Sequence, residues 1–122
     1  MASGNLFLSD HNAQSLRRAV VEDDGDVAFL YLTVPHLTKI AASAWIYNRT
    51  SSVFESSRDV AVADWALLWS HDGHSVAVLA DDFPLACIVN ASNPGYSRGL
   101  TAATSLGNTW DDLVYTRIFG RV

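Results

Sequence analysis

Residues 60–89 read VAVADWALLWSHDGHSVAVLADDFPLACIV, and this stretch decides the fold. It contains three apolar runs of strand length, separated by two short polar turns. The first turn holds Asp72-Gly73, a pair that favours a tight hairpin because glycine adopts the positive φ that the turn requires. The second turn is Asp81-Asp82, and Pro84 is acceptable near the start of the strand that follows. The stretch therefore predicts a three-stranded antiparallel meander. Large apolar side chains would share one face of its first strand: Trp65, Leu67 and Trp69.

A second hairpin is predicted over residues 15–34. Its turn is the acidic run 22–26, which contains another Asp-Gly pair. The arm that follows, Val27 to Val34, is rich in the β-branched and aromatic residues typical of strands. A short helix over residues 12–20 is an alternative that the sequence leaves open.

The remaining segments are less regular. Residues 44–48, Ala-Trp-Ile-Tyr-Asn, favour one further strand. Residues 1–14 are polar and mixed, and we expect them to be poorly ordered. We expect loops over residues 49–59, which are rich in serine and arginine, and over residues 90–108, which contain two glycine-bearing turns.

The C-terminal segment predicts an amphipathic helix. Apolar and long side chains recur there at helical spacing: Trp110, Leu113, Val114, Arg117 and Ile118. Thr109 is the predicted N-cap, two aspartates follow in the first turn, and Gly120 would end the helix. The whole chain, residues 1–122, is thus expected to be one α+β domain, mainly β. Its architecture would be an antiparallel meander of about five to six strands with the C-terminal helix packed on one face.

Composition limits the possible partners. The chain has 122 residues and a formal net charge of −5, so a basic face for nucleic acid or for an anionic membrane is not expected. Charged residues make up only 17% of the chain, below the roughly 25% of ordinary domains, which favours a surface that binds another protein or a second copy. The N-terminus lacks the features of a signal peptide, and no apolar run approaches about 18 residues, so we expect a cytoplasmic protein.

The turn His71-Asp72-Gly73-His74 is the most conspicuous candidate for chemistry. Two imidazoles and a carboxylate could ligate zinc, but a further ligand would have to come from elsewhere. The candidates are His11, His36, Asp81 and Asp82. A solvated hairpin tip is the simpler interpretation, and we predict neither a metal nor another cofactor.

No catalytic residue can be assigned from the sequence. The run 22–26 lacks the spacing of an EF-hand calcium loop, and the chain has no serine elbow, phosphate-binding loop or dinucleotide motif. Cys87, the single cysteine, lies in an apolar run, where burial would raise its pKa. The residues that we predict to contribute to binding belong to the two acidic turns and their edges: Glu22, Asp23, Asp24, Trp69, His71, Asp72 and His74.

Four short motifs occur in a characteristic order: Glu22-Asp23-Asp24-Gly25, Ile46-Tyr47-Asn48, Trp69-Ser70-His71-Asp72-Gly73 and Phe83-Pro84-Leu85-Ala86. In this order the chain resembles, over about residues 20–90, the small bacterial family called domain of unknown function 2251. The resemblance implies a cytoplasmic bacterial protein with no established activity. It transfers no catalytic residues to this chain.

Three functions follow as hypotheses. The first is a non-catalytic protein-binding module, in one version an immunity-type protein whose acidic surface neutralises a basic partner. The second is a small metal-dependent enzyme or metalloprotein that uses His71, Asp72 and His74. The third is a subunit of a structural homo-oligomer that pairs through a sheet edge. We favour the first over an enzyme.

Overall fold

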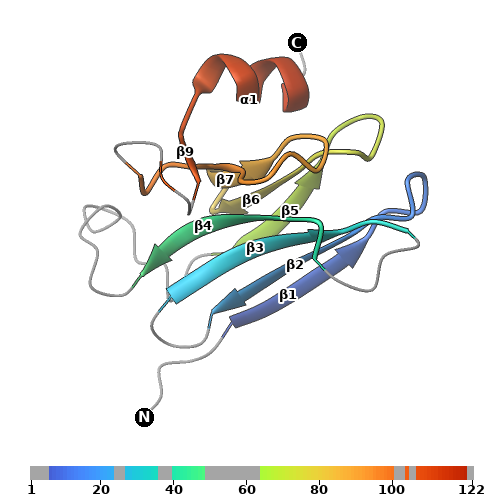
Figure 1. Cartoon of the computed structure of the whole chain (residues 1–122), viewed down its shortest axis with the longest axis horizontal. Coiled ribbons are helices and arrows are strands. Elements are labelled where there is room, and N and C mark those ends of the chain that lie inside the picture. The colour runs from blue at the N-terminus through green and yellow to red at the C-terminus, as the bar shows by residue number, and fades with distance from the viewer. Residues whose placement is uncertain are drawn as a thin grey trace.

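The computed structural model describes residues 6–23, 27–35, 40–48, 64–100, 104 and 107–120. Within these residues, two β-sheets pack face to face and a helix covers the second sheet (Figure 1). The first sheet is antiparallel, in the order β1-β2-β3-β4. Its strands are β1 (Leu6–His11), β2 (Arg18–Asp23), β3 (Val27–Thr33) and β4 (Ala42–Asn48).

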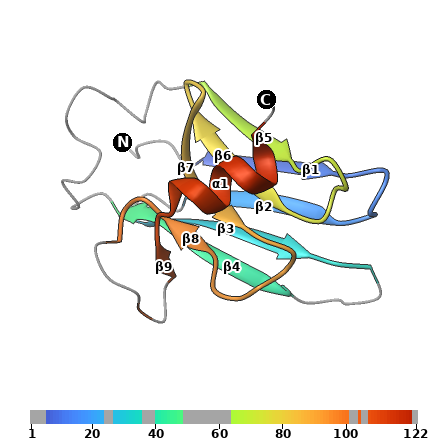
Figure 2. The same cartoon turned by 90° about the horizontal axis from the view of Figure 1, so that it is seen from above.

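The second sheet has the order β5-β6-β7-β8-β9. It consists of β5 (Trp65–Trp69), β6 (Val76–Ala80), β7 (Phe83–Ile88), β8 (Tyr96–Ser97) and β9 (Asn108–Thr109). Its pairs are antiparallel except for β8 and β9, which are parallel. Helix α1 (Asp112–Phe119) follows β9 and crosses the outer face of this sheet (Figure 2).

The main core lies between the two sheets, because alternate side chains of each strand point inward. Leu30 and Leu32 of β3 and Ile46 of β4 are fully buried there. A second, smaller core forms where α1 meets the outer face of the second sheet, around Cys87 and Phe119. The second sheet is thus apolar on both faces, whereas the first sheet buries one face.

Side chains and backbone join the sheets at both edges. On one edge, the Trp69 indole N–H donates a hydrogen bond to Asp10 Oδ2 at 2.8 Å and links β5 to β1. On the other edge, the Gly95 N–H donates to the Ser43 carbonyl at 2.9 Å, and the Gly95 carbonyl accepts from the Asn108 N–H at 2.7 Å. These contacts limit how far the sheets can slide over one another.

The structure confirms the mainly β fold with a C-terminal helix on one sheet face. The meander of residues 60–89 appears as β5, β6 and β7 in the described part of that stretch, and Trp65, Leu67 and Trp69 all pack against the main core. The hairpin of residues 15–34 is β2 and β3, and residues 44–48 lie within β4. The strands divide between two packed sheets, each of which contains a meander.

Other expectations were wrong. A helix over residues 12–20 is not formed, since Arg18–Val20 belong to β2. Residues 6–11, where we expected poor order, form β1, because Leu8 can pack against the core from that position. The expected loop of residues 90–108 contains the short strand β8 and the first residue of β9. The expected loop of residues 49–59 lies outside the described residues.

The helix also differs in detail from its prediction. Its N-cap is Asp111, whose carboxylate accepts hydrogen bonds from the N–H groups of Leu113 and Val114, so Thr109 does not cap it. Leu113 is 81% exposed, although helical spacing placed it on the inner face. Phe119 is buried in its place, because α1 turns toward the sheet the face that holds Tyr115, Ile118 and Phe119 at helical spacing.

Candidate functional site

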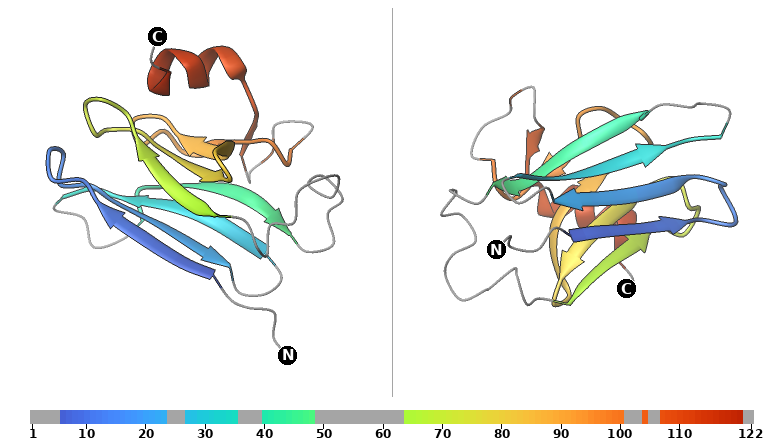
Figure 3. Two further views of the ribbon diagram at one scale, coloured as in Figure 1. Left: turned by 180° about the vertical axis from the view of Figure 1, so that it is seen from behind. Right: turned by 90° about the horizontal axis from the view of Figure 1, so that it is seen from below.

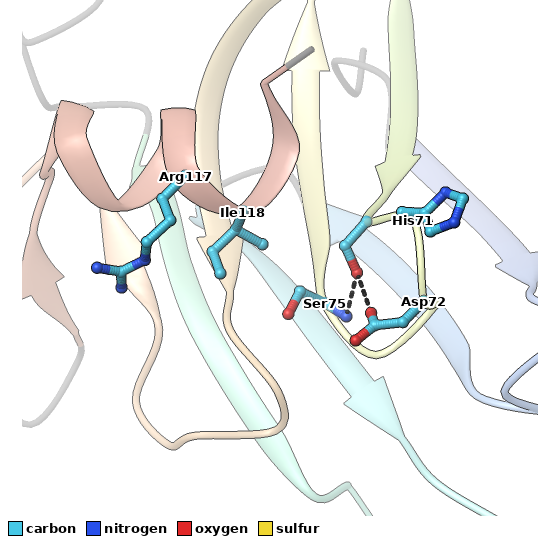
Figure 4. A pocket seen from close by; sticks show the side chains of 6 residues that line it. His71, Asp72, Ser75, Arg117 and Ile118 are labelled. Atoms are coloured by element: carbon cyan, nitrogen blue, oxygen red, sulfur yellow. Dashed lines mark hydrogen bonds between the residues drawn. The ribbon is translucent and has the colours of Figure 1, made fainter. Parts of the chain in front are cut away.

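The conspicuous turn of residues 70–75 borders an open hollow of about 280 Å³. The hollow lies between this turn, which joins β5 to β6, and the C-terminal half of α1 (Figure 4). It is lined by Ser70, His71, Asp72, Ser75, Arg117 and Ile118. Four of these residues are polar and belong to the predicted turn or its flanks.

The polar side chains of the turn are engaged in shaping it. Asp72 Oδ1 accepts hydrogen bonds from the Ser70 hydroxyl at 2.7 Å and from the His74 N–H at 3.0 Å. Ser70 Oγ in turn accepts from the Ser75 N–H at 3.0 Å. The hydrogen bond from the His74 backbone, followed by that from Ser70, lowers the pKa of Asp72 below its ordinary value. Asp72 therefore acts as a turn residue whose negative charge stabilises the loop.

Gly73 supplies the conformation that the Asp-Gly pattern predicted. Its φ is +76°, in the left-handed region that favours glycine. A Cβ at this position would also collide with the Asn12 side chain of the turn between β1 and β2. The two turns are further joined by Arg17, whose guanidinium donates to the His74 carbonyl at 2.8 Å. The turn of residues 70–75 is thus held in place by its neighbour.

The hollow does not bring its charged groups together. In Figure 4, the His71 ring and the Arg117 guanidinium point away from each other, and Asp72 lies on the turn side. His74 approaches Asp72 with Nδ1 3.4 Å from Oδ2, but both side chains are about half exposed. No nucleophile and base pair therefore forms among these residues.

Two of the proposed extra metal ligands lie away from the turn of residues 70–75. Asp81 and Asp82 are at the opposite end of β6 from His74, and His36 is outside the described residues. Within residues that the structure describes, no group of three or more histidine, cysteine, aspartate or glutamate side chains is arranged to hold a metal ion. The arrangement gives the metal hypothesis no geometric support.

The predicted binding residues separate into two groups. Glu22 and Asp23 end β2 and lie at the far end of the first sheet from the Arg17–His74 contact, so they are remote from the turn of residues 70–75. Asp24 and the side chain of Asp23 lie outside the described part of the chain. Trp69 does not extend either group, because it packs against the core and its N–H bonds to Asp10.

The outer face of the first sheet is a different surface, which the sequence analysis did not single out. Val21 and Leu30 point into the core, so their neighbours Val20, Glu22 and Tyr31 point outward. We call this surface the β1–β4 face and define it by Ser9, His11, Arg18, Val20, Glu22, Phe29, Tyr31, Thr33 and Ser43. In the right panel of Figure 3, its four strands lie in front, and α1 lies behind the second sheet.

The β1–β4 face has an aromatic centre and charged margins. The Phe29 and Tyr31 rings stack with centroids 5.8 Å apart and an interplanar angle of 17°. Both are partly exposed, as is Val20, which pairs with Tyr31 across the strands. Arg18 and Glu22 are exposed at either end of β2. The sequence gives little signal for this face, because the outward residues Val20 and Phe29 are as apolar as their inward neighbours Val21 and Leu30.

The Trp45 side chain leaves β4 on the side of the β1–β4 face, opposite Phe29, but it adds no exposed surface to that face. It is only 6% exposed. A Cβ added at Gly99 would overlap the Trp45 ring, so the ring lies against the Gly99 backbone. Gly99 therefore provides the space in which this large side chain is buried.

Cys87 and Arg98 are a reactive and a charged residue that both contribute to the fold. Cys87 is buried as predicted, and burial raises the pKa of its thiol to about 12, so it is protonated at neutral pH. The Arg98 guanidinium lies over the rings of Phe83 and Trp110, 4.3 and 4.4 Å from their centroids, and 3.6 Å from Asp112. Arg98 thus ties the start of α1 to the second sheet.

Comparison with known proteins gives one match. The model of a family described as an uncharacterized protein conserved in bacteria (DUF2251) matches residues 1–117, a longer span than the four sequence motifs cover. Neither the curated proteins nor the solved structures yield a match to this chain. No helix among the described residues has the length and apolar character needed to cross a membrane.

Proposed function

The chain belongs to DUF2251, a family of uncharacterized proteins conserved in bacteria, and we propose that it is a non-catalytic protein-binding module. The observation that carries the proposal is the β1–β4 face, where the stacked pair Phe29 and Tyr31 lies partly exposed, with Glu22 and Val20 opposite these rings on the neighbouring strand. Aromatic residues and arginine are enriched in protein interfaces, whereas lysine and glutamate are depleted there. The β1–β4 face holds no lysine and one glutamate.

The placement of α1 supports this choice of surface. The second sheet buries its outer face under the helix, around Phe119. The first sheet buries only its inner face, and in the described part of the chain its outer face meets no helix (Figure 3). A flat sheet face with an aromatic centre and hydroxyl-bearing neighbours such as Ser9 and Thr33 can dock a protein without a deep cavity.

The other candidate surface fits catalysis less well than it fits a structural role. Ser70, Asp72 and Ser75 use their polar atoms within the turn or for the next loop, where Ser75 Oγ accepts from the Asn90 N–H at 2.9 Å. Cys87 is buried and protonated. We therefore assign no reaction to the protein.

The test is affinity capture from the host cell with an aromatic-to-arginine variant. Tagged wild-type protein should retain a protein in stoichiometric amount, and Phe29→Arg should lose it, because a buried guanidinium would meet the partner's apolar surface. Leu113→Arg is the matched control, since Leu113 is an exposed apolar residue on α1, on the opposite side of the molecule. Thermal denaturation would show that each variant is folded. Equal retention by the wild type and Phe29→Arg would refute the proposal.

In its narrower form, the proposal is an immunity-type protein that neutralises a basic partner. The net charge of −5 supports this form, as do the exposed carboxylates of Glu22, Asp64, Asp81 and Asp82. Opposite charge would accelerate association with such a partner. A toxin-like gene next to the gene for this protein, with a basic product that binds the chain, would support it. A captured partner that is acidic would refute this narrower form and leave the wider one standing.

A further inference from the structure

We propose that two copies of the chain pack their β1–β4 faces against each other about a two-fold axis that crosses the strands at Val20. This inference rests on the proposed function, since it uses the same face, and it names the occupant of that face as a second copy. The axis would run along one row of paired residues that crosses the sheet: Ser9, Val20, Tyr31 and Ser43.

The strand register makes the face self-complementary about this row. Arg18 and Glu22 lie two residues before and two residues after Val20 on β2, and all three point outward. A two-fold axis through Val20 and across the strands reverses the direction of β2 in the second copy. Arg18 of one copy then faces Glu22 of the partner copy, and the same pair forms a second time. Symmetric contacts of this kind are the commonest in homo-oligomers.

The charges favour this orientation over its reverse. With the strands of the two copies running in the same direction, Arg18 would face Arg18 of the partner copy and Glu22 would face Glu22. Like charges placed together in an interface disfavour association. Packed sheets lie about 10 Å apart, a distance that an arginine and a glutamate side chain can span together. No ion pair to either side chain is present in the described residues, so both are available for this contact.

The apolar centre of the face lies on the axis. Val20 and Tyr31 would each meet their own counterpart, and Phe29 would meet Thr33 of the partner copy. Four strands of about six residues make a face of roughly 19 by 20 Å, so two copies would bury about 800 Å² in total, below the limit of about 1,000 Å² for a stable specific interface. We therefore expect a weak dimer that forms at micromolar or higher concentration.

Charge reversal tests the pairing directly. The wild type should be dimeric at about 100 µM by sedimentation equilibrium, a concentration above the expected dissociation constant. Arg18→Glu and Glu22→Arg should each be monomeric there, with a dissociation constant raised at least about tenfold. The double variant should dimerise again. A mixture of the two single variants should form a heterodimer, because each then faces only opposite charges.

Controls separate this inference from loss of fold and from the proposed function. Arg117→Glu reverses an exposed charge on α1 and should leave the dimer unchanged. Circular dichroism and thermal denaturation would verify each variant's fold. A monomeric wild type, or a mixture that stays monomeric, would overturn the inference. If the monomeric wild type still captures another protein through Phe29, the proposed function stands; if it captures none, both fail.

Discussion

Replacing Gly95 by alanine should destabilise the protein strongly. Gly95 is buried at the edge where β4 of the first sheet meets the second sheet. Its N–H donates to the Ser43 carbonyl at 2.9 Å, and its carbonyl accepts from the Asn108 N–H at 2.7 Å. The residue thus connects both sheets through its backbone, and any displacement of that backbone weakens both hydrogen bonds.

The size of this loss in the free energy of unfolding follows from the contacts that the added methyl group would make. A Cβ on Gly95 would overlap the Cys87 carbonyl oxygen and would lie 2.9 Å from Ala44 Cβ. The first atom belongs to the backbone of β7, so the strand itself must move. Overpacking of this kind costs about 1–3 kcal/mol, and each weakened backbone hydrogen bond adds about 0.5–1.5 kcal/mol. We expect Gly95→Ala to lower the free energy of unfolding by about 3–5 kcal/mol, a large fraction of a typical domain's stability.

Urea denaturation followed by tryptophan fluorescence would measure this loss. Gly107→Ala is the matched control, because its Cβ would come no closer than 3.1 Å to its nearest neighbours, the Gly95 carbonyl oxygen and a flexible side-chain carbon of Leu100. Gly107→Ala should lower the free energy of unfolding by about 1 kcal/mol or less. A loss below about 1 kcal/mol for Gly95→Ala, or an equal loss for both variants, would refute the argument that the two sheets are held at this contact.

Three further predictions concern other parts of the fold. Asp111→Ala should lower the free energy of unfolding by about 1 kcal/mol in urea denaturation because it removes the N-cap of α1, whereas Thr109→Ala should have little effect. Asp82→Gly should raise the free energy of unfolding by about 1 kcal/mol, because Asp82 has a φ of +68°, in the left-handed region that favours glycine. Asp81→Gly should show no such gain, because it also removes the hydrogen bond that the Asp64 N–H donates to Asp81 Oδ1. Burial raises the pKa of Cys87 to about 12, so between pH 9 and pH 12 only the unfolded chain releases the thiol proton. The contribution of Cys87 to the free energy of unfolding should therefore be fully present below pH 9 and should be lost as the pH rises from 9 towards 12. Cys87→Ala should flatten this slope in denaturation curves measured at several pH values.

Local patterns predicted the elements whose causes are local. Asp72-Gly73 marks a turn because glycine adopts a positive φ, and the structure has Gly73 at +76°. Trp65, Leu67 and Trp69 alternate, so one face of β5 is apolar whatever covers it. The four ordered motifs likewise indicated the family that the whole-chain comparison identifies.

The candidate site was less predictable, because it depends on contacts between distant segments. Glu22 and His74 both lie near Asp-Gly pairs in the sequence, yet only the topology places these two residues far apart. The β1–β4 face needs the register of four strands, which aligns Ser9, Val20 and Tyr31 in one row. Spacing along a single strand does not contain that information.

The amino-acid sequence by itself determined that this chain makes β-hairpins, buries its single cysteine in an apolar run, and has an amphipathic helix near its C-terminus. These features follow from backbone sterics and from the periods of strands and helices, which act over a few residues. Only the tertiary structure decided that the hairpins form two sheets, that α1 covers the second of them, and that Phe29, Tyr31, Arg18 and Glu22 share an outward face. The reason is that the pairing of sheets is set by the total apolar surface they bury together, a property of the whole chain.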